Sequence, residues 1–173
     1  MLNILIACDH IISRGKLLRA LSSPHLPCAV CLCADIYAAI SICGQQQPDI
    51  VLIDGSCDPL AAVEATRKIT SSSAANVIAF SRQTDADFAA HMMAAGALGY
   101  LSNDATQLQV ATAVLEVAKD NLYNCIDNHV LPLPTPEKIS PFLKSISSFK
   151  KNAREKMRSA TEIHWHGILR FTN

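Results

Sequence analysis

Residues 48–54, which read Pro48-Asp49-Ile50-Val51-Leu52-Ile53-Asp54, are the stretch that decides the fold of this chain. The residues from Ile50 to Ile53 are apolar and mostly β-branched, and no charge interrupts them. Short uncharged runs of this kind are typical of strands buried on both faces, as they are in parallel sheets. The stretch therefore predicts a buried strand with a carboxylate, that of Asp54, at its carboxyl end.

Similar apolar runs occur on both sides of this stretch, and helical patterns separate them. The runs predict four further strands, at residues 2–7, 29–32, 77–80 and 99–101. Apolar residues at helical spacing predict five helices, at residues 11–21, 35–44, 60–69, 85–95 and 105–122. A strand and helix pattern repeated five times predicts an α/β fold, in which a five-stranded parallel sheet is doubly wound between two layers of helices.

Polar side chains gather where the predicted strands end. Asp9, Asp54, Ser81 and the pair Ser102-Asn103 all stand at these positions. In doubly wound folds the ligand site lies at the carboxyl ends of the strands, beside the switch in strand order. We therefore expect these side chains to form the functional site.

Composition excludes several classes of protein. Half of the 173 residues are apolar and 17% are charged, which predicts a packed domain rather than a disordered chain. No run reaches the ~18 apolar residues of a membrane span, and the segment before Cys8 lacks the charged start and length of a secretory signal. We therefore expect a cytoplasmic protein whose seven cysteines are free thiols in a reducing compartment.

The first predicted turn also argues against an enzyme. Nucleotide enzymes of this fold class use a glycine-rich first turn to hold phosphate. Residues 1–14 contain no glycine. The missing turn argues against a nucleotide enzyme in particular, and we expect a protein that is not an enzyme.

Four motifs, in order along the chain, carry a resemblance to a known family. They are residues 4–10, 48–54, 77–81 and 96–104, which read ILIACDH, PDIVLID, VIAFS and GALGYLSND. Together they resemble the receiver domain of bacterial response regulators, above all of those that precede a helix-turn-helix DNA-binding domain. The resemblance covers about residues 1–125 and implies a flavodoxin-like fold with the strand order 2-1-3-4-5.

The resemblance also implies roles for individual residues. Asp54 matches the aspartate that accepts a phosphoryl group, and the donor would be a histidine kinase of a two-component phosphorelay. Mg²⁺ would be held by Asp9, Asp54 and the main-chain carbonyl near Ser56, because it is a hard cation that binds oxygen. Ser81 matches the switch hydroxyl that bonds the phosphoryl oxygens, and Tyr100 matches the switch aromatic.

The sequence departs from the family pattern in three places. Cys8 stands where the first acid of an acidic pair is expected, and Asn103 stands where the family has a lysine that contacts the phosphoryl oxygens. The turn at residues 58–62 also differs from the usual one. Two hypotheses follow: a receiver phosphorylated on Asp54, or a pseudo-receiver that acts as an interaction module independently of phosphorylation.

The pattern of alternating strands and helices breaks after residue 125. Residues 1–125 carry 7 Lys+Arg and 11 Asp+Glu, whereas residues 126–173 carry 8 and 4. We expect a receiver-like domain at 1–125, a Pro-rich linker at 126–141 and a basic tail with one amphipathic helix at 142–173. One helix is too little for a helix-turn-helix, so we expect no sequence-specific DNA binding from the tail, and no membrane binding.

Association into a homodimer is a further expectation. The family resemblance implies a contact face that spans residues 85–122. The predicted buried stripe of its last helix is Leu108, Thr112, Leu115, Ala118 and Leu122. Met92, Met93, Val114 and Val117 are then apolar residues in excess of the buried stripes, which predicts that some of them lie in an interface.

Overall fold

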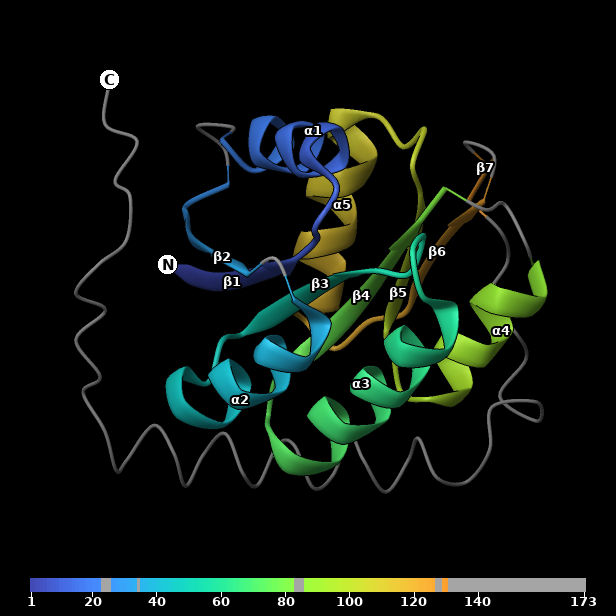
Figure 1. Cartoon of the computed structure of the whole chain (residues 1–173). Coiled ribbons are helices and arrows are strands. Elements are labelled where there is room, and N and C mark those ends of the chain that lie inside the picture. The colour runs from blue at the N-terminus through green and yellow to red at the C-terminus, as the bar shows by residue number, and fades with distance from the viewer. Residues whose placement is uncertain (23–25, 34, 83–85, 127–128, 131–173) are drawn as a thin grey trace.

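The computed structural model of this chain describes residues 1–22, 26–33, 35–82, 86–126 and 129–130 (Figure 1). Its strands are β1 (Leu2–Ala7), β2 (Cys28–Cys33), β3 (Ile50–Asp54), β4 (Asn76–Ser81), β5 (Gly99–Ser102), β6 (Tyr123–Ile126) and β7 (His129–Val130). Its helices are α1 (Ile11–Leu21), α2 (Ile36–Gln46), α3 (Pro59–Ser72), α4 (Ala86–Ala94) and α5 (Gln107–Val117).

The strands form one sheet in the order β2-β1-β3-β4-β5-β6-β7. Neighbours from β2 to β6 pair in parallel, and β7 pairs antiparallel with β6. The predicted α/β class and the strand order 2-1-3-4-5 are confirmed. The strands β6 and β7 were not predicted, and β6 ends one residue past the predicted domain boundary at 125.

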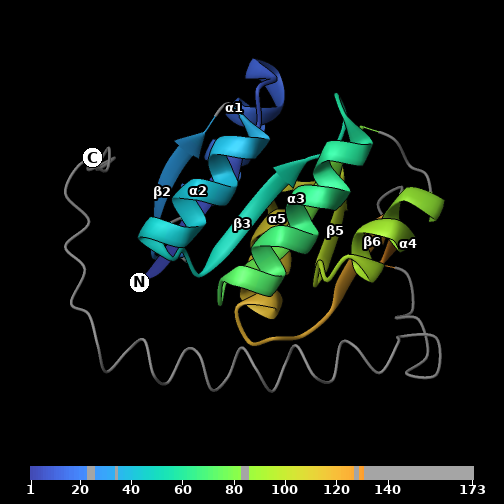
Figure 2. The same ribbon diagram turned by 60° about the horizontal axis from the view of Figure 1, so that its bottom comes forward.

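Helices cover both faces of this sheet. α1 and α5 lie on one face, and α2, α3 and α4 lie on the other (Figures 1 and 2). Val51 and Ile53 pack with the second group of helices, whereas Ile50 and Leu52 pack with α1 and α5. Because side chains alternate along a strand, Asp54 follows Leu52 toward the face of α1 and α5. All of β3 is therefore buried, as the sequence predicts.

Helix caps fix the chain just beyond two of the strands. His10 caps α1, and its Nδ1 accepts a hydrogen bond from the Ser13 amide at 3.3 Å. Asp58 caps α3, and its Oδ1 accepts from the Ala61 amide at 2.9 Å. Pro59 stands in the first turn of α3, where its missing N–H has no helical partner to lose. These caps fix the chain next to Asp9 and the loop that follows Asp54.

The predicted stripe of α5 is wrong at its two leucines Leu108 and Leu115, whereas Ala118 and Leu122, beyond the end of the helix at Val117, pack partly buried against the core. Leu108 and Leu115 are 76% and 41% exposed, and the helix instead buries Val110, Ala113, Val114 and Val117. These smaller residues allow α5 to approach the sheet and α1 closely, so they fill the core in place of the leucines.

The expected homodimer rests on apolar residues in excess of the buried stripes, and the prediction of this excess is wrong as well. Met92 and Met93 on α4 are buried, like Val114 and Val117 on α5. None of the four contributes appreciable apolar surface to an interface.

The expected linker and tail fall almost entirely outside the described residues. Of residues 126–173, the structure describes only Ile126 and the short strand β7. The linker at 126–141, the tail at 142–173 and its lack of DNA binding therefore stay predictions. Among the described residues, every helix is too short or too polar to cross a membrane.

Candidate functional site

The carboxyl ends of the strands meet at one edge of the sheet. Asp54 ends β3, and Cys8 and Asp9 follow β1, which pairs with β3. Ser81 ends β4 and lies beside Ser102 of β5 in the register of the sheet. The structure therefore gathers the predicted site residues at this edge.

The Asp54 carboxylate is nearly buried, with 4% of the residue exposed, and both of its oxygens are bonded. Oδ1 accepts a hydrogen bond from the Ser56 amide at 2.9 Å, and Oδ2 accepts one from the Cys8 thiol at 3.1 Å. The main-chain donor fixes the direction of the carboxylate, whereas a thiol is a weak donor. Oδ2 is therefore the oxygen that is more easily released for another contact.

Cys8 keeps its proton at this position. Burial, followed by the hydrogen bond to Asp54 and the negative charge of that residue, raises the pKa of the Cys8 thiol to about 12. The thiol therefore donates to Asp54 at neutral pH. Where the family resemblance leads one to expect a second carboxylate, this chain has a neutral donor, so the site carries less negative charge.

Asp9 and Cys57 form a second contact at the exposed side of the site. The Cys57 thiol donates to Asp9 Oδ1 at 3.5 Å. That bond, a smaller effect of burial and the charges of Asp9 and Asp54 raise the pKa of Cys57. Asp9 and Asp54 also raise the pKa of Cys8, after burial. The two carboxylates and two thiols therefore form one electrostatic cluster, in which Cys57 was not predicted.

The cluster offers a cation only part of a ligand set. Within residues 1–22, 26–33, 35–82, 86–126 and 129–130, no three His, Cys, Asp or Glu side chains are arranged to hold a metal ion. Mg²⁺, however, is commonly held by one or two carboxylates together with water and substrate phosphate. Asp9 and Asp54, with a main-chain carbonyl near Ser56, fit such a site in the kind of donor they supply.

Ser56 ties the loop after β3 to the end of β4. Its amide donates to Asp54, and its hydroxyl accepts a hydrogen bond from the Arg82 amide at 2.9 Å. The Gly55 amide donates to the Phe80 carbonyl at 2.8 Å. These bonds hold the loop against the neighbouring strand and place Ser56 beside Asp54.

The two predicted switch residues are both buried. Ser81 and Tyr100 have no exposed surface, and the Tyr100 ring packs edge-on against Phe88 of α4, with 6.2 Å between the ring centres. A Cβ atom on Gly55 would overlap the Phe88 ring, with only 2.8 Å to Cε1. Phe88 therefore touches both the residue after Asp54 and the predicted switch aromatic.

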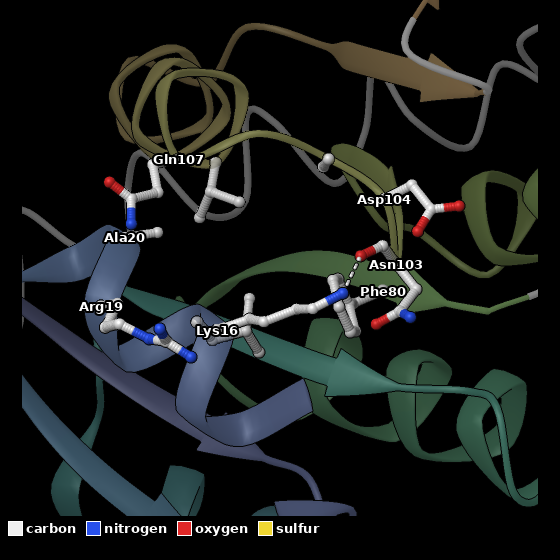
Figure 3. Close-up of a pocket in the computed structure, with 10 residues that line it drawn as sticks. Lys16, Arg19, Ala20, Phe80, Asn103, Asp104 and Gln107 are labelled. Carbon is white, nitrogen blue, oxygen red and sulfur yellow. Dashed lines mark hydrogen bonds between the residues drawn. The ribbon is translucent and has the colours of Figure 1, made fainter. Parts of the chain in front are cut away.

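Asn103 lies at the far end of the site, against α1. Its main-chain N–H donates to the Ser81 main-chain carbonyl at 2.7 Å, and its side-chain carbonyl accepts from the Ser13 hydroxyl at 3.4 Å. The main-chain carbonyl of Asn103 accepts from the Lys16 ammonium at 3.4 Å (Figure 3). These contacts border a pocket of about 300 Å³ between α1 and the loop after β5. The sequence did not predict Ser13 or Lys16, because no motif links α1 to residue 103.

Comparisons with known proteins agree with this arrangement. The family model of the response regulator receiver domain matches residues 4–115. The response regulator UvrY of Escherichia coli K12 is 33% identical over 147 residues, which are 82% of this chain and 67% of UvrY.

Solved structures are similar as well. The signal receiver domain of the response regulator NarL from Mycobacterium tuberculosis has a TM-score of 0.62 and 25% identity, over 68% of this chain and 96% of that one. A LuxR-family two-component response regulator from Aurantimonas sp. has the same fold, with a TM-score of 0.64 and 22% identity over 88% of this chain and 99% of its own. Since the family model spans well over half of the chain and UvrY is similar along most of it, this chain belongs to the response regulator receiver domains of two-component systems.

Proposed function

We propose that Asp54 accepts a phosphoryl group in the presence of Mg²⁺, so that this domain works as a phosphorylated receiver. The observation that carries the proposal is the state of the Asp54 carboxylate. It ends a fully buried strand, its direction is fixed by the Ser56 amide, and its Oδ2 is held by a weak thiol donor. A nucleophile so placed is already oriented for attack.

The transfer itself needs no base. A carboxylate oxygen of Asp54 forms a bond to phosphorus, and the bond from phosphorus to the leaving group breaks, with its electron pair remaining on the leaving group. Donors of this class are a phosphohistidine of a kinase or a small acyl phosphate. Positioning and neutralisation of charge supply most of the acceleration in phosphoryl transfer.

Asp9, Asp54 and the main-chain carbonyl near Ser56 are the residues that would hold Mg²⁺. When bound, the ion supplies positive charge to the phosphoryl oxygens. Asp9 is exposed, and its contact with Cys57 is a long thiol bond at 3.5 Å. The Asp9 carboxylate is therefore easily released for a cation. Because Cys8 is neutral, the ion faces two negative charges instead of three, so we expect weak Mg²⁺ binding.

The test is direct phosphorylation of the full chain. With acetyl phosphate and Mg²⁺, intact-mass spectrometry should show the gain of one phosphoryl group, stable in acid and lost in base. Asp54→Asn keeps the size of the side chain and should abolish the gain. Asp104→Asn, an exposed carboxylate near the same edge of the sheet, is the matched control and should react as the natural protein does. A natural protein that gains no mass with any donor would refute the proposal.

A second candidate is the pseudo-receiver, which binds a partner protein without phosphorylation. The Cys8 thiol on Asp54 Oδ2 and the amide at Asn103 favour it, because neither supplies the charge expected there. Under this reading, the double variant Cys8→Asp with Asn103→Lys should gain phosphorylation that the natural chain lacks. Equal rates in the two proteins exclude the pseudo-receiver.

A further inference from the structure

The phosphorylation proposed above adds negative charge that has no positively charged partner at residue 103. A phosphoryl group on Asp54 brings several negative oxygens next to Asp9. Asn103, where the family has a lysine, offers only a neutral amide. Phosphoryl oxygens in a partly buried site need a full positive charge as a partner. The question is which cation of this chain can supply one in addition to Mg²⁺.

Lys16 already contacts the residue that stands in place of the missing lysine. From α1, its ammonium group donates to the main-chain carbonyl of Asn103 at 3.4 Å (Figure 3). Ser13, three residues earlier on α1, donates to the side chain of the same asparagine at 3.4 Å. Residues three apart lie on one face of a helix, so this face of α1 is turned toward Asn103. Leu17 is buried in the core, which fixes the rotation of the helix.

Lys16 and Asp54 lie on the same side of the sheet. Phe80 is the register partner of Asp54 in the neighbouring strand, and its ring packs in the core that α1 and α5 cover. The same Phe80 lines the pocket that Lys16 borders. The ammonium group therefore approaches from the face toward which Asp54 is directed, across about two strand spacings of ~4.8 Å.

The present contact of Lys16 is weak enough to be exchanged. Its residue is exposed, and its partner is a neutral carbonyl at the long end of hydrogen-bond distance. A lysine side chain is a mobile point charge on a flexible stem. A phosphoryl oxygen, as a charged acceptor, is a stronger partner than a carbonyl.

Two other cations near the site are less well placed. Arg82 follows β4, and its main-chain amide donates to the Ser56 hydroxyl at 2.9 Å, which places its main chain beside the loop after Asp54. Arg19 lines the same pocket as Lys16, but its Nε donates to the Gly15 carbonyl within α1 at 3.4 Å. Among the residues that the structure describes, Lys16 is the cation that donates a hydrogen bond to residue 103.

We propose that Lys16 contacts the phosphoryl oxygens at Asp54 and replaces, from α1, the lysine that Asn103 lacks. The inference rests on the proposed phosphorylation of Asp54. Lys16 forms and breaks no covalent bond and keeps its protons. It stabilises the charge of the transferred group through hydrogen bonds that the unphosphorylated domain does not have.

The test compares phosphorylation rates of full-length variants with acetyl phosphate and Mg²⁺. Lys16→Ala should slow the reaction at least about tenfold, as expected for the loss of a charge-assisted hydrogen bond. Asn103→Lys in the Lys16→Ala background should restore most of the rate. Arg19→Ala, which removes a cation from the same helix and pocket, should leave the rate unchanged.

The outcomes separate the two proposals. If the natural chain reacts and Lys16→Ala reacts equally fast, the role of Lys16 is refuted while phosphorylation of Asp54 stands. If Arg82→Ala slows the reaction and Lys16→Ala does not, Arg82 is the cation and the inference is again wrong. If the natural chain is inert but Asn103→Lys reacts, both proposals fail. Thermal unfolding of Lys16→Ala should match that of the natural chain, because the side chain is exposed.

Discussion

The two sides of the site differ in how closely their side chains are held. The acceptor side comprises Cys8, Asp9 and the loop from Asp54 to Ser56, and Asp54 is nearly buried with bonds of 2.9 and 3.1 Å. The cation side comprises Ser13, Lys16 and Asn103. The Ser13 hydroxyl donates to the Asn103 side chain and the Lys16 ammonium donates to the Asn103 main-chain carbonyl, both at 3.4 Å and beside a pocket. A carboxylate nucleophile depends on exact direction, whereas a point charge acts over a longer distance and can come from another element. The positive charge can therefore come from a different position in the sequence, whereas the aspartate must stay at the end of β3.

The largest expected effect comes from the strand that carries the acceptor. Leu52→Ala removes a fully buried side chain two residues before Asp54, and we expect a loss of about 3 kcal/mol in the free energy of unfolding. Leu108→Ala is the matched control, because that leucine is 76% exposed and should change stability by less than about 0.5 kcal/mol. Urea denaturation measures both. Similar losses in the two variants would contradict the assignment of faces in this fold.

A smaller loss is expected from the loop after Asp54. Gly55→Ala adds a Cβ atom that overlaps the Phe88 ring, and overpacking of this kind costs about 1–3 kcal/mol. The displaced ring should also disturb Tyr100, which packs against it. The double variant Gly55→Ala with Phe88→Leu removes the overlap, so it should be less destabilised than the two single variants added together. Additive losses would mean that the added methyl group does not meet Phe88.

The sequence predicted the acceptor side better than the cation side, for a physical reason. The run Ile50–Ile53 is fixed by local chemistry, because a short, mostly β-branched apolar run bounded by turn residues is typical of a strand covered on both faces. The contacts of Lys16 with Asn103 and of Cys57 with Asp9 join residues far apart in the chain, and no short pattern encodes them.

The errors at α5 and β6 also arise because a local sequence pattern does not determine packing. Leu108 and Leu115 are the most hydrophobic residues of α5, yet smaller residues fill its contact with the sheet. The predicted stripe joined these leucines at helical spacing, whereas the packing depends on volume. Strand β6 has a polar residue, Asn124, in its short sequence, so it lacks the continuous apolar run that revealed β3.

The protonated thiol on the acceptor side predicts a dependence of stability on pH. The pKa of Cys8 is about 12 in the folded protein, raised from 9.0 mainly by burial and then by Asp54. Between these values the unfolded chain releases a proton that the folded chain keeps, so stability falls as pH rises above about 9, by at most ~1.4 kcal/mol per pH unit. Cys8→Ser removes this titration and should lose less stability between pH 8 and pH 10. Parallel losses in the two proteins would show that Cys8 is not the titrating group.

The smallest effect is expected on the cation side, at the end of β5. The Ser102 hydroxyl is buried, and no hydrogen-bond partner for it occurs among the residues that the structure describes. Ser102→Ala removes a polar group that gains nothing from burial, so stability should stay within about 0.5 kcal/mol of the natural value or rise. Ser81→Ala is the paired variant: Ser81 is its register neighbour, equally buried but with polar interactions of its own, and should lose about 1 kcal/mol. Thermal and urea denaturation of the two variants measure the difference. If Ser102→Ala were the more destabilised of the two, the cation side would be as tightly bonded as the acceptor side, and the contrast between them would be lost.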